Sequence, residues 1–107
     1  MTSPGAAARD PGAALVIRSG GGRSGEAFTF TGDRMTIGRS PEAEIFLDDV
    51  TVSRRHAEFH RDGGTFTVRD VGSLNGTYVN RVRVDSVDLR NGDEIQVGKY
   101  RFKFVFT

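Results

Sequence analysis

The sequence of 107 residues contains no cysteine and no tryptophan, and only two histidines. Without cysteine the chain cannot form disulfides or thiolate metal sites, and one class of nucleophile is absent. His56 and His60 alone offer too few nitrogen ligands for a metal centre. We therefore predict that the protein has no metal site.

Long hydrophobic runs are missing as well. No stretch approaches the roughly 20 apolar residues needed to cross a bilayer, and residues 1–14 lack the apolar core of an export signal. Lysine and arginine total 15 against 14 acidic residues, a net charge of +1, whereas a dedicated nucleic-acid binder carries a dense basic surplus. We expect a cytoplasmic monomer that binds neither nucleic acid nor a membrane. Any recognition of anions must come from the local placement of charges.

One domain accounts for the chain, because its length is enough to bury a single small core. Residues 1–13 are rich in alanine, glycine and proline and show no periodic pattern, which predicts a flexible N-terminal tail. Residues 14–107 are expected to form the domain. Within them no stretch long enough for a stable helix keeps a helical apolar period without a glycine break.

Short alternating segments separated by turn signals recur instead, and they predict an all-β antiparallel sandwich or barrel. In residues 100–106 aromatic side chains alternate with Arg101, Lys103 and Val105, and successive strand side chains face opposite ways. The same spacing of two occurs at Phe28 and Phe30, Ile45 and Leu47, Ala57 and Phe59, and Phe66 and Val68. The breaks between segments fall at residues 20–25, 31–33, 62–64, 72–76 and 91–92, and Asp62-Gly63-Gly64 is a predicted hairpin connection.

A first polar block, Gly38-Arg39, follows the apolar residues Met35 and Ile37, so Arg39 is expected where a strand runs out into a loop. A guanidinium there can offer two parallel donors to phosphate oxygens, a geometry that lysine cannot match. Taken alone, a surface arginine in a small salt bridge is the commoner outcome. The two later blocks favour a role for Arg39 as a ligand of a phosphate group.

The second block, Ser53-Arg54-Arg55-His56, places a hydroxyl donor and two cations in one short loop. A phosphothreonine carries about −1.5 to −2 charges near neutral pH, and Ser53 with Arg54 is a natural pair for it. Neighbouring residues of an extended chain face opposite ways. Arg54 is therefore predicted to contact the ligand, and Arg55 to face solvent or scaffold. The alternative for both arginines is a solvated basic turn.

His56 opens the segment Ala57-Glu58-Phe59, and a histidine at such a junction most often holds a loop in shape through hydrogen bonds to nearby backbone. Its alternative role is general base to Ser53, with Asp70 as the third member of a catalytic set. No strand-to-helix elbow of the Gly-x-Ser-x-Gly type supports that alternative. We predict that the protein is not an enzyme.

The third block is Ser73-Leu74-Asn75-Gly76-Thr77. The Asn75 amide can both donate to and accept from an extended peptide backbone. Asn-Gly is also the strongest signal for a type I′ turn, and the two readings are compatible because a tight turn can present an amide rigidly. Ser73 is interpreted as architectural, since its hydroxyl can bond the backbone of its own loop.

Two other signals are weaker. Residues 20–25 formally satisfy Gly-x-Gly-x-x-Gly, but that nucleotide-binding motif must open a helix, whereas residues 26–31 alternate like a strand. A glycine-rich hairpin is predicted there, and no cofactor is expected. Asp48-Asp49 lacks further ligands at calcium-loop spacing, so a solvated loop is the default.

Together these blocks make residues 14–106 resemble a forkhead-associated (FHA) domain. The elements that carry the resemblance are Gly38-Arg39, Ser53-x-x-His56, Ser73-x-Asn75-Gly76-Thr77, and Asn91-Gly92-Asp93 with Ile95 and Val97. The resemblance implies an eleven-stranded β-sandwich of two twisted, predominantly antiparallel sheets. It also implies that loops at one end of the sandwich bind phosphothreonine peptides.

Site roles follow from the same resemblance. It implies that Arg39 and Ser53 are direct phosphate ligands and that Arg54 contacts the phosphate or the peptide backbone. Asn75 is implied to clamp the peptide main chain after the phosphothreonine. The residues implied to shape the loops are Gly38, His56, Ser73, Gly76 and Thr77.

Residues 45–59 and 70–81 further resemble small actinobacterial FHA regulators that serve Ser/Thr protein kinases and control 2-oxoglutarate metabolism. The implied function is a phosphothreonine-dependent adaptor in bacterial Ser/Thr kinase signalling, whose partner is a kinase or a kinase substrate such as a metabolic enzyme. Those regulators carry an N-terminal threonine motif that docks on their own site once phosphorylated, whereas residues 1–13 here offer only Thr2 and Ser3. The alternative function is a phosphate-independent β-sandwich interaction module of a larger protein.

Overall fold

Eleven strands form the fold. The structure, a computed structural model, describes residues 12–106, and these hold eleven strands and no helix. No segment of this part of the chain is a helix long and apolar enough to cross a membrane. The strands are β1 (Ala13–Ser19), β2 (Ala27–Thr29), β3 (Arg34–Gly38), β4 (Ile45–Phe46), β5 (Ala57–Asp62), β6 (Thr65–Asp70), β7 (Thr77–Val79), β8 (Val82–Val84), β9 (Ser86–Asp88), β10 (Glu94–Val97) and β11 (Tyr100–Phe106). The predicted all-β fold with eleven strands is confirmed.

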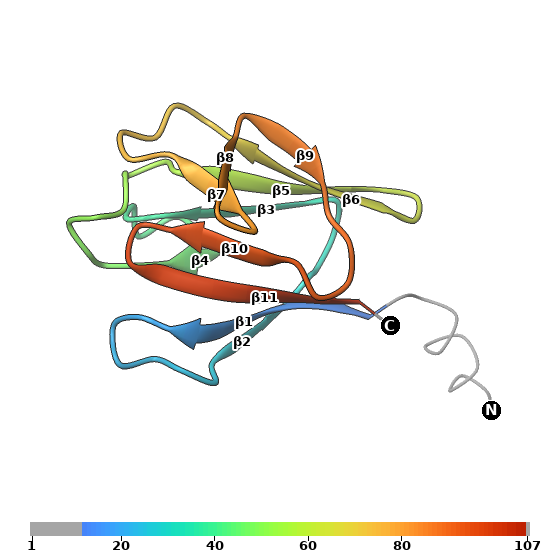
Figure 1. Cartoon of the computed structure of the whole chain (residues 1–107), viewed down its shortest axis with the longest axis horizontal. Coiled ribbons are helices and arrows are strands. Elements are labelled where there is room, and N and C mark those ends of the chain that lie inside the picture. The colour runs from blue at the N-terminus through green and yellow to red at the C-terminus, as the bar shows by residue number, and fades with distance from the viewer. Residues whose placement is uncertain (1–11, 107) are drawn as a thin grey trace.

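The strands make two sheets that face each other as a sandwich (Figure 1). One sheet has six strands in the order β2-β1-β11-β10-β7-β8, and the other has five in the order β4-β3-β5-β6-β9. Every neighbouring pair is antiparallel except β3 and β4, which run parallel. Figure 1 places the loops after β3, β4 and β6 together at the left end, and the end of β11 at the right.

Strand β11 shows the alternation predicted for residues 100–106. The side chains of Tyr100, Phe102 and Phe104 are buried, whereas Lys103 is exposed. The other side chains predicted at a spacing of two are also buried, apart from the half-buried Phe28; they are Phe30, Ile45, Leu47, Ala57, Phe59, Phe66 and Val68. The core therefore lies between the two faces that the sequence pattern indicated.

Phe66 on β6 lies at the centre of an aromatic cluster. It is only 2% exposed, and its ring centroid lies 5.2 Å from that of Phe30, 5.3 Å from that of Phe104 and 5.0 Å from that of Phe106. These distances are in the range of favourable aromatic pairs. Because the contacts join β6 of one sheet to β11 of the other, they hold the two layers together.

Strand pairing confirms two predicted turns. β1 and β2 pair antiparallel on either side of residues 20–25, so the glycine-rich segment is a hairpin. Asp62 pairs with Thr65, so Gly63-Gly64 is the two-residue turn between β5 and β6. The predicted tail comprises residues 1–13. Residues 1–11 of it lie outside the described part of the chain, and Ala13 is the first residue of β1.

We expect Phe66→Ala to lower the free energy of unfolding by about 3–5 kcal/mol, because the neighbouring side chains fill the resulting cavity only in part. Urea unfolding followed by circular dichroism measures the change. Phe46→Ala is the matched control, since Phe46 is 38% exposed, and its effect should stay below about 1 kcal/mol. Equal losses in the two variants would contradict the placement of the core.

Candidate functional site

Three loops meet at one end of the sandwich, at the left of Figure 1, and each carries one of the polar blocks. The Arg39 N–H donates to the Ser53 carbonyl at 2.9 Å. The Leu74 N–H donates to the Ser53 Oγ, also at 2.9 Å. Arg39, Ser53 and Asn75, which are 14 and then 22 positions apart in the sequence, are thereby brought to the same end of the molecule.

Gly38, the last residue of β3, allows that strand to approach the second loop closely. A Cβ atom at this position would lie 2.2 Å from the Arg54 carbonyl oxygen, so only glycine fits. The same carbonyl accepts the Ser40 N–H at 3.1 Å, and the Ile37 carbonyl accepts the His56 N–H at 3.1 Å. Backbone hydrogen bonds therefore define the point at which the chain leaves β3.

The guanidinium of Arg39 is anchored through one nitrogen. Its Nε donates to the Val52 carbonyl at 3.1 Å, and the side chain is half-buried. Its terminal Nη atoms have no hydrogen bond or ion pair with any of residues 12–106. The salt bridge considered as an alternative for Arg39 is therefore absent from this part of the chain. The N–H groups on the two Nη atoms of Arg39 therefore remain available to donate hydrogen bonds to an anion.

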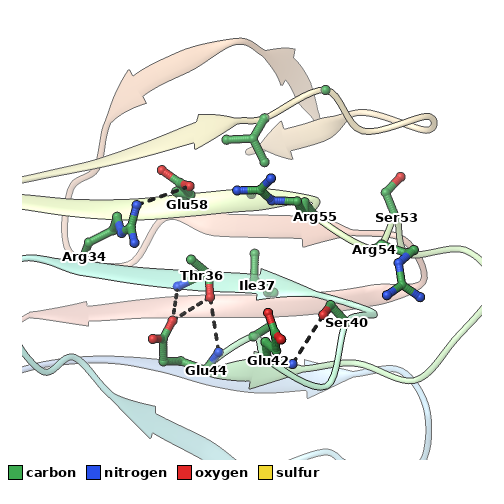
Figure 2. Close-up of a pocket in the computed structure, with 14 residues that line it drawn as sticks. Arg34, Thr36, Ile37, Ser40, Glu42, Glu44, Ser53, Arg54, Arg55 and Glu58 are labelled. Atoms are coloured by element: carbon green, nitrogen blue, oxygen red, sulfur yellow. Dashed lines mark hydrogen bonds and ion pairs between the residues drawn. The ribbon is translucent and has the colours of Figure 1, made fainter.

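Ser53, Arg54 and Arg55 border one hollow of about 830 Å³ on the outer side of β3 and β5 (Figure 2). Because the Ser53 Oγ already accepts one N–H, its hydroxyl hydrogen is left to donate. Arg54 stays near Ser53 at the loop end, whereas the Arg55 side chain runs along β5 towards Glu58 (Figure 2). Both arginines are exposed, and neither forms an ion pair with another described residue. Arg54 therefore places its positive charge at the loop end of this hollow, and Arg55 places its charge over β5.

His56 joins the second loop to the third. Its ring is fully buried, the Nδ1 accepts the Ser53 N–H at 3.1 Å, and the Nε2 lies 2.9 Å from the Gly76 carbonyl oxygen. Because Nδ1 accepts a hydrogen bond, the ring proton is assigned to Nε2, which donates to Gly76. Burial lowers the pKa of His56 below its ordinary value of 6.5, although the Gly76 hydrogen bond and the charge of Asp70 oppose this shift. Both ring nitrogens of the neutral ring thus serve backbone groups and not the Ser53 hydroxyl.

Asp70 organises the third loop. Its carboxylate accepts hydrogen bonds from the Gly72 N–H at 2.8 Å, from the Ser73 N–H and Oγ at 3.0 and 2.5 Å, and from the Thr77 Oγ1 at 2.8 Å. The Ser73 Oγ in turn accepts the Gly76 N–H at 2.9 Å. Burial by itself raises the pKa of Asp70, but the hydrogen bonds from Ser73, Thr77 and Gly72 outweigh it, and the pKa is lowered. The carboxylate therefore accepts its hydrogen bonds from the third loop and from the first residue of β7, and it is committed to shaping that loop.

Asn75 is held by the second loop. Its side chain is exposed, and its Nδ2 donates to the Thr51 carbonyl at 3.1 Å. The Thr51 hydroxyl donates to the Asp49 carboxylate and accepts the Lys99 N–H at 3.0 Å, while the Lys99 Nζ lies 2.9 Å from the Asp49 Oδ1. Hydrogen bonds from Thr51 and Lys99 lower the pKa of Asp49 to about 2. The amide is thus oriented by a charged network that reaches the turn between β10 and β11.

Asn75-Gly76 is not the type I′ turn that its sequence allowed. That turn requires positive φ at both residues, and of the two only Gly76 has it, at 91°. A Cβ atom on Gly76 would lie 2.7 Å from the Nε of Arg83, so this guanidinium packs against the loop. The backbone typical of a type I′ turn occurs instead at Asn80-Arg81, with φ of 50° and 70°, where the first residue of β10 bonds the Asn80 side chain.

Thr51, Asp49 and Lys99 were missed by sequence analysis. The spacing of Asp49 and Thr51 is that of an Asx turn, and the Thr51 N–H does donate to the Asp49 carboxylate at 2.9 Å. Asp49 is therefore a structural residue and not merely part of a solvated loop. No local signal indicates Lys99, which is 48 residues from Thr51 in the sequence. Across residues 12–106, no three metal-ligating side chains are grouped so that they could hold an ion.

The chain is similar in sequence to a family model and to known regulators. A sequence model described as "FHA domain" matches residues 35–98. Glycogen accumulation regulator GarA of Mycolicibacterium smegmatis is 56% identical over 94 residues, which are 88% of this chain and 60% of that protein. Oxoglutarate dehydrogenase inhibitor of Corynebacterium glutamicum is 52% identical over 103 residues, or 96% of this chain and 72% of that protein.

A solved structure is also similar. It comes from a structural and functional analysis of phosphothreonine-dependent FHA domain interactions, and it is 33% identical to this chain with a TM-score of 0.81. The match covers 88% of this chain and 95% of that one. By contrast, the chain spans less than two thirds of the length of the GarA relative.

We expect the free energy of unfolding to decrease as the pH falls below about 6.5. The unfolded chain binds a proton at the ordinary histidine pKa of 6.5, while the folded-state pKa of His56 is lowered, so acid favours the unfolded state. This contribution is fully present above pH 6.5 and is lost as the pH falls through the folded-state pKa. Urea unfolding at a series of pH values from about 7.5 to about 5 measures the slope.

The two histidines provide matched variants for this measurement. His56→Gln should flatten the slope in that pH range. His60→Gln should retain it, because His60 is half-buried on β5 and its Nε2 contacts Glu58 at 2.9 Å, away from the loops. A slope that disappears only in His60→Gln would show that the buried ring is not the titrating group.

Proposed function

The chain belongs to the FHA domain family, and we propose that its loop end binds phosphothreonine in a partner protein. The observation that carries this proposal is the guanidinium of Arg39. It is anchored by Nε at 3.1 Å from the Val52 carbonyl and keeps its terminal N–H groups unpaired within residues 12–106. Ser53, whose carbonyl accepts the Arg39 N–H, offers its hydroxyl hydrogen as a further donor.

Arg39, Ser53 and Arg54 are the proposed phosphate ligands. A phosphothreonine with about −1.5 to −2 charges would accept two N–H donors from Arg39, the Ser53 hydroxyl hydrogen and a donor from Arg54. Hydrogen bonds to charged groups contribute about 1.5–3 kcal/mol each, so a few of them separate modified from unmodified threonine by orders of magnitude. The Arg39 and Ser53 backbones are linked at 2.9 Å, which supports a spacing of donors that is preset before the ligand arrives.

Asn75 is the proposed clamp on the main chain that follows the phosphothreonine. One N–H of its Nδ2 is used by Thr51, which leaves the other N–H and the Oδ1 for an extended peptide. The bond to Thr51 reduces the conformational entropy that the amide would otherwise lose on binding. The residues proposed to shape these loops are Gly38, His56, Ser73, Gly76 and Thr77, and the close approaches and hydrogen bonds described above support that role.

The partner is proposed to be a Ser/Thr protein kinase or one of its substrates, including a metabolic enzyme. The relatives support this, because their names describe a regulator of glycogen accumulation and an inhibitor of oxoglutarate dehydrogenase. The chain matches only 60% of the GarA protein. Regulation of an enzyme, which the name of the whole relative describes, is therefore proposed for this chain. We further propose that the domain is a cytoplasmic, monomeric adaptor without catalytic activity.

Phosphate-independent docking is the second candidate function, and two apolar side chains favour it. Val50 is 92% exposed and Leu74 is 84% exposed, and both lie on the loops that carry the site. Exposed apolar side chains of this kind can anchor a partner through hydrophobic contact alone. This candidate predicts equal binding of phosphorylated and unphosphorylated partners.

We expect a phosphothreonine peptide to bind at least about 100-fold more tightly than its unphosphorylated twin, because an unmodified threonine cannot accept the charge-assisted hydrogen bonds. Isothermal titration calorimetry measures both affinities. Arg39→Lys should weaken binding of the phosphopeptide about tenfold or more, although the charge is kept, because lysine cannot present two parallel donors.

Arg90→Lys is the matched control for that substitution. Arg90 is exposed in the segment between β9 and β10, and Figure 1 places that segment at the end of the sandwich opposite the three loops, so the affinity should be unchanged. Equal affinity for the two peptides, combined with a loss of binding in Leu74→Ser, would refute phosphothreonine recognition and support the second candidate.

A further inference from the structure

The two outer faces of the sandwich differ in charge, although the whole chain has a net charge of only +1. On the five-stranded sheet the exposed and half-buried charges are mixed; they are Arg34, Arg61, Arg69, Glu58, Asp62, Asp70 and Asp88, and Glu44 directly precedes β4. On the six-stranded sheet Arg18 of β1, Arg83 of β8 and Arg101 and Lys103 of β11 stand against a single carboxylate, Glu94 of β10. We call Arg83, Arg101 and Lys103 the basic strip.

Strand register places the basic strip on one continuous surface. Arg83 pairs with Tyr78, Tyr78 with Gln96, and Gln96 with Arg101, so these four side chains form a row across β8, β7, β10 and β11. With neighbouring strands about 4.8 Å apart, the two arginines are about 14 Å from each other. Lys103 lies two residues further along β11 on the same face.

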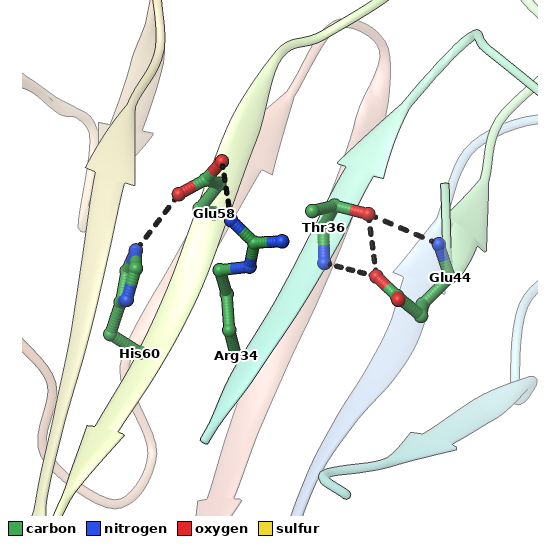
Figure 3. Close-up of polar contacts among 5 residues, drawn as sticks. All are labelled: Arg34, Thr36, Glu44, Glu58 and His60. Atoms are coloured by element: carbon green, nitrogen blue, oxygen red, sulfur yellow. Dashed lines mark hydrogen bonds and ion pairs between the residues drawn. The ribbon is translucent and has the colours of Figure 1, made fainter. Parts of the chain in front are cut away.

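Several charges of the five-stranded sheet have partners on the same surface, as Figure 3 shows. Glu58 lies 3.9 Å from Arg34 and 2.9 Å from His60, and the Glu44 carboxylate accepts the Thr36 N–H at 2.7 Å. Arg34, Glu58 and Glu44 are therefore partnered on that surface, whereas Arg69 forms no ion pair with another described residue.

In the basic strip, by contrast, no arginine or lysine forms an ion pair with any of residues 12–106. Glu94 pairs with Lys103 in the register of β10 and β11, but the two side chains form no ion pair. The Glu94 Oε2 is buried and has no hydrogen-bond partner in the described chain. The strip thus presents three unneutralised cations to a ligand.

A second hollow connects the strip to the proposed clamp. It has a volume of about 340 Å³, and the residues that line it are Thr51, Asn75, Gly76, Tyr78, Gln96, Gly98 and Lys99. Tyr78 and Gln96 are the middle members of the row that joins Arg83 to Arg101. A chain that leaves Asn75 through this hollow therefore passes directly onto the basic strip.

We propose that the basic strip binds an acidic segment that follows the phosphothreonine in the same partner chain, an inference that rests on the phosphopeptide binding proposed above. Charge complementarity selects the occupant, because three unpaired cations attract carboxylates. The row of about 14 Å matches about four residues of extended peptide at 3.3 Å each. Acidic residues beyond the immediate neighbourhood of the phosphothreonine would then decide which phosphorylated partners bind most tightly.

The test compares two phosphothreonine peptides by fluorescence anisotropy. Both carry the same glycine-serine linker after the phosphothreonine, and one then ends in a run of glutamates and the other in glutamines. At low salt the glutamate peptide should bind about fivefold or more tightly, the gain expected from a few exposed ion pairs. Near 1 M salt, where the Debye length is about 3 Å, the gain should disappear.

Charge-matched double variants locate the effect. Arg101→Gln with Lys103→Gln should remove the gain and leave binding of the glutamine peptide unchanged, because neither residue belongs to the proposed phosphate site. Arg69→Gln with Arg90→Gln removes two exposed cations elsewhere and should keep the gain. An equal loss in both double variants would attribute the gain to net charge and overturn the inference.

The remaining outcomes separate this inference from the function on which it rests. If both phosphopeptides bind equally, the basic strip is not a docking site, while phosphothreonine recognition stands. If neither phosphopeptide binds, phosphothreonine recognition fails and the inference fails with it. If a short DNA duplex binds to the strip and the glutamate peptide shows no gain, the strip is a nucleic-acid surface and the inference is wrong.

Discussion

A buried, neutral imidazole bonded to two different loops is the contact on which the binding end of this domain depends. Polar nitrogens removed from water cost free energy unless each has a partner, and both nitrogens of His56 have one, in the Ser53 N–H and the Gly76 carbonyl. The ring therefore fixes the distance between the loop that offers the hydroxyl and the loop that offers Asn75. Protonation would convert the accepting nitrogen into a donor that faces another donor, so this bridge exists only in the uncharged ring.

The groups that would meet a ligand differ in how firmly they are held. Arg39 and Ser53 are tied through their backbones and through Val52 and Leu74, and the Asn75 amide is tied to the second loop. Arg54 is exposed and has no ion-pair partner among the described residues, so it must lose side-chain entropy when it engages a phosphate. A rigid pair of donors with one adaptable cation can select the phosphate by geometry and still add charge to the complex.

Local patterns in the sequence indicated several of the strands, because burial on one face leaves a period of two in segments such as residues 100–106, whereas the count of eleven strands came from the family resemblance. These patterns were not enough for the site. Arg39, Ser53 and Asn75 could be named from their chemistry and from the family resemblance, but their convergence depends on sheet topology, which no local pattern encodes. The Asn75-Gly76 pair does not form the type I′ turn that the dipeptide allows, because the Gly76 N–H donates to the Ser73 Oγ and the Gly76 carbonyl bonds His56. Lys99 reaches Thr51 only through the fold.

The two ends of the described chain leave the sandwich side by side and far from the loops. Ala13 at the start of β1 pairs with Phe106 at the end of β11, and Figure 1 places these strand ends at the end of the sandwich opposite the loop that follows β3. Strand β1 has seven residues, and at about 3.3 Å per residue it spans about 23 Å. Any segment joined to either end must therefore run back along a whole strand before it can touch the loops. A tethered competitor shorter than that distance cannot reach the loops.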